Sequence, residues 1–328
     1  LNKLMPTVVI GPTVALIGLS LAGNAVADLT KASATGAAYS LAAIICGLFT
    51  FGVTIWVSAK GKGFAKLIPF IIGVLAGYAV ASVFTVIGNI ANIEALKIID
   101  YSALVNNFST LSLGTFFHMP KFAFVEAFKE ITGGSFAMTV ADFGTLTLLY
   151  APVALVVFAE HVADHKNISS IIERDLLENP GLDKTLLGDG VGSMAGAFFG
   201  CCPNTTYGES VGCVAITRNA SVVTIRTAAL LSILLAFFSP FVAFVNTIPS
   251  CVLGGICVAL YGFIAVSGLK MIQTVDLNKE HNLFVVSSIL VLGIGGFMLD
   301  FGALKITSIA ASLIVGIIVN QLLKEKEA

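Results

Sequence analysis

Two short polar segments with acidic residues stand within otherwise apolar stretches of this sequence. In the first, Glu160, His161, Asp164 and His165 close an apolar run that begins near residue 143. Glu160 and Asp164 share one face of a helix, and His161 and His165 share the adjacent face, because residues four apart are one turn apart. A charge at the centre of a membrane helix costs about 2.5–3.5 kcal/mol, so Glu160 indicates a function. For His165 the plainer interpretation is a helix end that enters water.

The second segment is residues 203–209, where the backbone cannot continue as a regular helix. Pro203 bars a helix, and residues 205–207 favour an extended backbone. A helix that starts near Gly208 would direct its positive end into the membrane interior, and Glu209 lies at this break. Extended backbone at that depth is tolerated only where it is buried in protein or lines a cavity. The segment therefore predicts a broken helix at a polar cavity, with a re-entrant structural loop as the alternative.

Two membrane carboxylates at a broken helix suit a polar small molecule that binds together with a cation. Burial favours the protonated form of a carboxyl group. That form presents a donor and an acceptor side by side, which matches the adjacent C=O and N–H groups of a pyrimidine or purine base. The ionised form has only acceptors, so binding of a proton and of a base would be linked. Glu160 and Glu209 therefore predict a symport site.

The composition places these residues in a membrane. Of 328 residues, 57% are hydrophobic and 11% are charged, and the mean hydropathy is +0.96. An ordinary soluble domain has about 25% charged residues, so soluble enzymes and disordered proteins are excluded. The net charge of −1 and the lack of a basic stripe exclude a nucleic-acid partner. His, Cys and Ser show no nucleophile–base pairing or metal spacing, so neither an enzyme, a metal nor a cofactor is expected.

Ten membrane crossings are expected, since each needs about 20 mostly apolar residues. The uncharged stretch 227–269 must hold two of them, with a break at 246–249. Thirteen of the 18 lysines and arginines fall in loops on one side, which places both termini in the cytoplasm. Residues 90–141 are then a partly ordered extracytoplasmic loop. The expected spans are 4–27, 38–58, 67–89, 143–163, 220–245, 250–269, 281–299 and 306–323, with two weaker, Gly-rich ones at 186–200 and 205–217.

Three consecutive helices are repeated within the chain. Residues Met5–Gly11 match Ile248–Gly254 at an offset of 243 residues, and the same offset relates the spans that follow. An odd number of crossings separates the copies, so they must be inverted, as in many secondary transporters. If both repeats are complete in nature, about 100 residues are missing before Leu1. A signal peptide ending at 25–27 is the alternative for the first span, and the repeat argues against it.

At these residues the sequence resembles the nucleobase–cation symporter-2 (nucleobase–ascorbate transporter) family, and most closely its bacterial uracil permease branch. The likeness covers nearly the whole chain and rests on Ala159–Val162, Pro203–Glu209, Ala215–Arg218 and Leu260–Gly262. It implies an all-α polytopic membrane protein with an inverted seven-plus-seven repeat. About ten of the fourteen helices are present, and the broken helix carries a short β-strand near 203–209.

The resemblance also implies a division into gate and core. Residues 1–89 would be the last three helices of the first repeat, in the gate, and 90–141 the extracytoplasmic loop. Residues 142–247 would be the first four helices of the second repeat, in the core. Residues 248–328 would be its last three helices, in the gate, with a cytoplasmic tail.

Substrate contacts follow from the same resemblance. In the family, the carboxylate that matches Glu160 bonds the base. The one that matches Glu209 does so too, together with backbone at Tyr207 and Gly208. The tyrosine that matches Tyr261 faces the site from the gate.

The proton-coupling residues are expected among Glu160, His161, Asp164 and His165. The best-known family pattern has a histidine four residues after the first glutamate, whereas this chain has Asp164 there and His165 next. Asp164 could carry the proton itself or favour Na⁺, so both coupling ions remain open. Ser210 stands where asparagine is usual, which bears on base selectivity.

The expected function is therefore proton-coupled uptake of uracil or a related nucleobase across the cytoplasmic membrane. An anion transporter of the related fold, of the sulfate or bicarbonate type, is an alternative that facing carboxylates disfavour. A sodium-coupled purine or xanthine symporter and a non-transporting membrane scaffold are the others. The expected partners are the nucleobase and the lipid bilayer, and a homodimer is one oligomeric state that the sequence leaves open.

Overall fold

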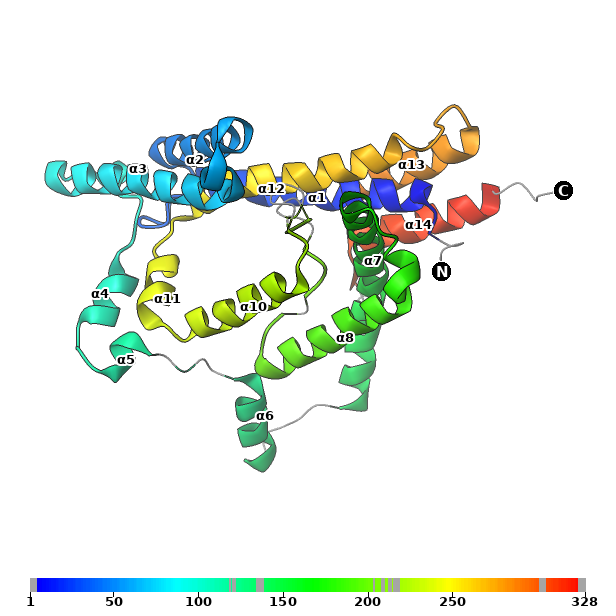
Figure 1. Cartoon of the computed structure of the whole chain (residues 1–328). Helices are drawn as coiled ribbons and strands as arrows, with labels where there is room; N and C mark the ends of the chain where they lie inside the picture. The colour runs from blue at the N-terminus through cyan, green and yellow to red at the C-terminus, as the bar shows by residue number, and fades with distance from the viewer. Residues whose placement is uncertain are drawn as a thin grey trace. The chain divides into compact units, whose positions relative to one another are not determined.

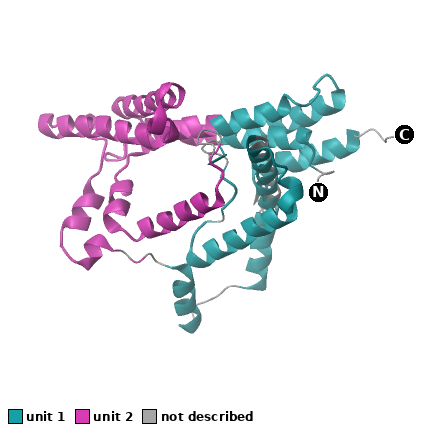
Figure 2. Cartoon of the chain, viewed as in Figure 1, with its two compact units in different colours: residues 1–20, 121–212, 263–328 teal, residues 21–120, 213–262 magenta. Residues whose placement is uncertain are grey.

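The computed structural model is mostly helical and divides into two compact units (Figures 1 and 2). Unit 1 comprises Leu1–Ser20, Lys121–Gly212 and Phe263–Ala328, and unit 2 comprises Leu21–Pro120 and Cys213–Gly262. The helical content confirms the expected all-α class. The structure describes residues 5–117, 119, 122–133, 139–202, 204–207, 210–211, 214, 219–300 and 305–323.

Among the described residues, four helices are long and apolar enough to cross a membrane. They are α1 (Thr7–Thr30), α2 (Leu41–Lys60), α3 (Pro69–Ala91) and α12 (Ser250–Ile272), and each lies within three residues of an expected span. Three shorter apolar helices are α10 (Val222–Ala236), α13 (Glu280–Ile294) and α14 (Ser308–Leu323). Many of their large apolar side chains face outward, which suits lipid and would be unfavourable in water.

In unit 2, α2 and α3 pack along each other because small residues meet at their contact. A Cβ on Gly73 would strike the Thr54 side chain, and one on Gly77 would strike that of Thr50. Small residues let membrane helices approach closely and gain van der Waals contact. This unit also contains α10 and the short elements η1 (Gly63–Leu67), η2 (Glu94–Leu96), α4 (Ser102–Phe108), α5 (Leu113–Phe116) and α11 (Ser239–Asn246).

Unit 1 contains the elements that bear the first acidic segment. They are α6 (Ala123–Thr132), α7 (Val140–Ile172), the π-helical turn η3 (Leu177–Gly181), α8 (Leu182–Phe199), α13, α14 and the hairpin strands β1 (Leu299–Asp300) and β2 (Lys305–Ile306). The helices α13 and α14 lie side by side, and α14 also packs on α7 (Figure 1). Gly316 of α14 leaves room for the Ile289 side chain of α13.

The first helices of the two repeated segments pack against each other in opposite directions. The helix α1 begins directly after Pro6, and α12 begins directly after Pro249. In unit 1, a Cβ on Gly268 would lie 2.6 Å from the Ala15 Cα, and one on Gly11 would lie 3.1 Å from the Ile272 Cγ1. Later residues of α12 therefore meet earlier residues of α1. In unit 2 the pattern is the same, since the start of α12 at Gly254 meets the end of α1 at Leu29.

The expected single span at 220–245 is wrong, because the chain forms two helices there. The helix α10 ends at Ala236, and α11 begins at Ser239. Pro240 in the first turn of α11 cannot donate a backbone hydrogen bond to Ala236, and its ring would clash with that carbonyl. The break predicted at 246–249 is confirmed, since α11 ends at Asn246 and α12 starts at Ser250.

Other boundaries also differ from expectation. The span expected at 281–299 ends as a helix at Ile294, where two glycines follow and Gly296 has a φ of 73°. The helix α7 runs nine residues beyond the expected 143–163. The described part of residues 90–141 holds four short helical elements, η2, α4, α5 and α6.

The short β-strand expected near 203–209 is not found in its described part. Residues 204–207 are irregular, and a strand needs a neighbour with which to pair. Pro203, Gly208 and Glu209 lie outside the described residues, as does most of the weak span expected at 205–217.

Candidate functional site

The helix α7 carries the first acidic segment and is held at both ends. Thr139 and Asp142 form a capping box, in which each side chain accepts a hydrogen bond from the other's backbone N–H, at 3.2 and 2.8 Å. The helix ends at Glu173, whose φ of 55° is left-handed. Between them, Phe158 and Val162 are buried in a cluster of apolar side chains from α1, α12, α13 and α14. This packing fixes which face of α7 carries the polar residues.

Glu160 contacts the irregular segment that follows α8. The Thr205 hydroxyl donates a hydrogen bond to Oε2 of Glu160 at 3.3 Å. Next to it, the buried hydroxyl of Thr206 has no hydrogen-bond partner among the described residues. Buried polar atoms are nearly always hydrogen-bonded, so this hydroxyl suits a polar ligand. The structure thus brings together the first acidic segment and part of the second.

His161 is the most deeply buried ionisable side chain of α7, with 1% of its surface exposed. Its Nδ1 lies 2.5 Å from Oδ2 of Asp189, and its Nε2 lies 2.9 Å from Oγ1 of Thr185. Asp189 and Thr185 are one turn apart on α8, so both point toward α7 from one face. Both ring nitrogens therefore have a partner on the neighbouring helix.

His165 stacks on His161, with the ring centroids 4.0 Å apart, so the expected shared face is confirmed. Its Nδ1–H donates to the His161 carbonyl oxygen at 2.9 Å. The helix does not end here, because α7 continues to Ile172. The side chains of Asp164, His165 and Lys166 are half-buried, and the Lys166 ammonium donates to the Thr7 hydroxyl at 3.4 Å.

The polar face of α8 continues to the irregular segment. One turn after Asp189, the Ser193 hydroxyl lies 2.7 Å from Oδ1 of Asn204 and 2.9 Å from its carbonyl oxygen. Asn204 directly precedes Thr205, which bonds Glu160. The contacts form a closed ring that runs from α7 to the segment, to α8 and back to α7 through His161.

The remaining predicted site residues are not all placed with this ring. The Tyr207 side chain is 63% exposed, while Gly208 and Glu209 lie outside the described residues. Tyr261 lies in α12, in unit 2, and is half-buried there.

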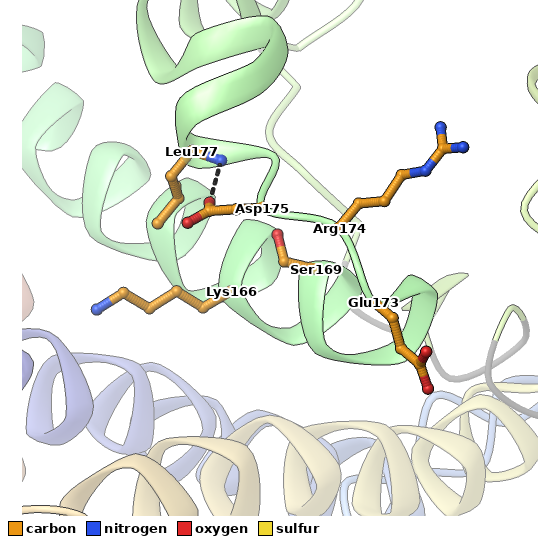
Figure 3. Close-up of a pocket in the computed structure, with 6 residues that line it drawn as sticks. All are labelled: Lys166, Ser169, Glu173, Arg174, Asp175 and Leu177. Atoms are coloured by element: carbon orange, nitrogen blue, oxygen red, sulfur yellow. Dashed lines mark hydrogen bonds between the residues drawn. The ribbon is translucent and has the colours of Figure 1, made fainter.

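A pocket at the far end of α7 contains none of the predicted site residues. It is lined by Lys166, Ser169, Glu173, Arg174, Asp175 and Leu177 (Figure 3). Lys166 and Arg174 point in different directions, so their charges do not converge on one ligand. In the part of the chain that the structure describes, no group of three His, Cys, Asp or Glu side chains could hold a metal ion.

Comparison of the sequence with known proteins identifies its family. A model of the Permease family matches residues 1–301. The chain belongs to this family.

Three relatives show how far the similarity extends. A uracil permease of Bacillus caldolyticus is 35% identical over 329 residues, which cover 98% of this chain and 68% of that protein. Uracil permeases of Escherichia coli (strain K12) and Bacillus subtilis (strain 168) are 36% and 32% identical, over 97% and 100% of this chain and 66% and 71% of theirs. The chain thus spans about two thirds of the length of these relatives. As a Permease family member it is a multi-pass membrane protein and not an enzyme.

Sequence reasoning missed the α8 side of the site. Asp189 is an acidic residue within the weak span at 186–200, and Thr185, Asp189 and Ser193 recur every four residues. That spacing was a readable signal of one polar helix face. Only the folded chain shows that this face meets His161.

Proposed function

We propose that this chain is a secondary active transporter that takes up uracil or a related nucleobase across the cytoplasmic membrane in symport with protons. The observation that carries the proposal is the contact between Glu160 and Thr205, beside the buried Thr206 hydroxyl. In this contact an acidic side chain meets irregular backbone next to a hydroxyl that can bond a polar ligand. The names of the relatives supply the substrate class.

The chemistry of a carboxyl group supports recognition of a base. In its protonated form Glu160 would pair with adjacent C=O and N–H groups of the ring, and ionisation would remove the match. Glu209, backbone at Tyr207 and Gly208, and the Tyr261 side chain would complete the site. Proton binding and base binding then favour each other, which is the requirement for symport.

We also propose the inverted seven-plus-seven repeat, with a gate made from 1–89 and 248–328 and a core from 142–247. Its support is the pair of helices that begin after Pro6 and Pro249 and run in opposite directions where they touch. Gly73 and Gly316, 243 residues apart like the two prolines, both sit at close helix contacts. The excess of Lys and Arg on one side favours a cytoplasmic C-terminus.

The test is uptake of radiolabelled uracil by the complete gene product in cells that lack their own uracil transport. Glu160→Gln should lower uptake at least about 30-fold, because an amide cannot bind and release a proton and losing a buried charged hydrogen-bonding group costs about 2–5 kcal/mol. Glu173→Gln, at the exposed end of the same helix, is the matched control and should transport normally. Full uptake by Glu160→Gln would contradict the proposed site.

Competition and ion replacement test the finer points. Excess unlabelled uracil should block uptake, whereas sulfate or bicarbonate should not. Collapse of the pH gradient should abolish accumulation, and replacement of Na⁺ should leave it unchanged. Dependence on Na⁺, or competition by xanthine in place of uracil, would favour the sodium-coupled purine symporter.

A further inference from the structure

The cluster of His161, Asp189 and Thr185 joins α7 to α8 immediately beside Glu160. It is built from three polar side chains in apolar surroundings, and the imidazole is almost fully buried. Burying such groups is unfavourable unless each one is paired. A helix contact can be chiefly apolar, as that of α13 and α14 is, although Nε2 of His281 and Oδ1 of Asn320 lie 3.0 Å apart across it. The cost of burying this cluster therefore indicates a role other than packing.

The Thr185 hydroxyl has two acceptors within reach. Its oxygen lies 2.9 Å from Nε2 of His161 and 3.2 Å from the carbonyl oxygen of Leu182. A hydroxyl has one hydrogen to donate and can also accept. If it donates to Nε2, the imidazole is neutral, with its other proton on Nδ1 toward Asp189. If it donates to Leu182, its oxygen is free to accept a hydrogen bond from a proton on Nε2.

We propose that His161, Asp189 and Thr185 form a proton-binding site. An incoming proton binds the Nε2 lone pair, and the Thr185 hydroxyl turns from that nitrogen to the Leu182 carbonyl. The Nδ1–H continues to donate to the Asp189 carboxylate throughout. No covalent bond of the protein is broken, and both imidazole nitrogens and the Thr185 hydroxyl are hydrogen-bonded in both states.

The Asp189 carboxylate favours this reaction. With a neutral imidazole the pair carries the single negative charge of Asp189, and with an imidazolium it is an ion pair of zero net charge. The helices α1, α13 and α14 turn apolar side chains toward this part of α7. The other ionisable side chains near it on the two helices are Glu160, Asp164, His165 and Lys166 of α7 and the exposed Lys184 of α8. Of these His165 is stacked on the ring, and its protonation would oppose that of His161.

The same contacts connect this proton site to the proposed substrate site, and the inference rests on that proposal. His161 follows Glu160 directly, so a change in its bonding to α8 acts at the position of the carboxylate. On the other side, Asp189 and Ser193 lie one turn apart on α8, and Ser193 holds Asn204. Protonation of His161 would thus shift the positions of Glu160 and Asn204, the two residues that hold Thr205.

The decisive experiment compares two modes of transport by the purified complete gene product in liposomes. Accumulation of radiolabelled uracil is driven by an imposed pH gradient, and uracil exchange is measured without a gradient. His161→Asn keeps a donor for Asp189 but cannot take up the proton, and Asp189→Asn removes the stabilising charge. Both should lower accumulation at least about tenfold, the effect of one pH unit of proton affinity, and should lower exchange much less than accumulation. Asp183→Asn, on an exposed turn of α8, is the control and should behave as wild type.

The outcomes separate the two proposals. Absence of uracil exchange in the wild-type protein would defeat the proposed function. Normal exchange with undiminished accumulation in Asp189→Asn would overturn the proton site alone. Equal loss of both activities in an intact protein would also overturn it, because the cluster would then be a structural clamp.

A second pair of variants keeps the test informative if Asp189→Asn does not fold. Thr185→Ser retains the rotating hydroxyl and should keep proton-driven accumulation. Thr185→Val is similar in volume but lacks the hydroxyl, so accumulation should fall and its dependence on external pH should flatten. Identical pH profiles for Thr185→Ser and Thr185→Val would contradict the role of the hydroxyl.

Discussion

Two helix pairs carry polar side chains into apolar surroundings and use them differently. In α2–α3, the hydroxyls of Thr50 and Thr54 each donate at 2.8 Å to the carbonyl oxygen one turn earlier in their own helix. In α7–α8, the polar atoms of His161, Asp189 and Thr185 bond across the helix contact. The first arrangement satisfies each polar group locally and leaves the contact to packing. The second makes the geometry of the contact depend on hydrogen bonds.

The difference shows how to distinguish polar side chains that only pack from polar side chains that have a function in a membrane protein. A hydroxyl bonded within its own helix adds little to the position of its neighbour. A charged group bonded between helices is desolvated, and its partner is left unsatisfied when it is removed. In these two helix pairs, the partner of each hydrogen bond is therefore more informative than the residue type.

The largest effect is expected where packing alone holds the contact. Gly77→Leu should force α3 away from Thr50 and lower the free energy of unfolding by on the order of 3 kcal/mol, as overpacking does. Gly52→Leu on α2 is the control, because no atom lies within 4 Å of a Cβ built there. Thermal unfolding in detergent measures both variants. Equal melting temperatures would show that α2–α3 is not closely packed.

A smaller effect is expected where hydrogen bonds hold the site. Ser193→Ala removes both bonds to Asn204 and should raise the KM for uracil about tenfold, with little change in thermal stability. Ser232→Ala on α10 is the matched control, since that hydroxyl donates only to Ala228 in its own helix among the described residues. An unchanged KM in Ser193→Ala would show that α8 does not contribute to substrate binding.

The end of α8 should respond as a packing contact. Phe124 of α6 stacks on Phe198 of α8, with ring centroids 4.7 Å apart. A double-mutant cycle of Phe124→Ala and Phe198→Ala should give a coupling of about 1 kcal/mol in the free energy of unfolding. Phe128→Ala, on the same helix but 68% exposed, should show no coupling to Phe198. Coupling that appears in the KM and not in stability would place α6 with the site.

The smallest effect tests the α2–α3 pair at a hydroxyl. Ser82→Ala removes a hydrogen bond of 2.8 Å to the Tyr78 carbonyl of the same helix. Stability should change by less than about 0.5 kcal/mol, because alanine favours the helix and the carbonyl keeps its backbone bond. Uptake should be normal. A large loss of uptake would erase the contrast with Ser193→Ala.

Much of the helical framework could be predicted, because hydropathy and proline act locally. The uncharged stretch 227–269 is too long for one span, and Pro249 marks where the second begins. The break at Pro240 was missed because a long run without charges gives no sign of it, although proline disrupts the backbone regardless of hydropathy. The predicted matching of Pro6 with Pro249 agrees with the start of α1 and of α12.

Half of the candidate site could be predicted in the same way. Glu160 stood out because a charge in an apolar run is unfavourable, and its contact with Thr205 joins the two polar segments that were singled out. Asp189 did not stand out, because α8 is Gly-rich and only weakly apolar. Its pairing with His161 depends on how α7 and α8 lie against each other, which no local pattern determines. Glu209 stays a prediction.

The length of α7 has a practical consequence. Its 33 residues extend about 50 Å, whereas the hydrocarbon layer of a bilayer is about 30 Å thick. Several turns must therefore project into the aqueous phase, and the charged end near Glu173 is the natural candidate. A cysteine placed on this projecting end would react with membrane-impermeant thiol reagents from one side of the membrane only. A single labelling experiment would therefore determine the orientation of the chain in the membrane.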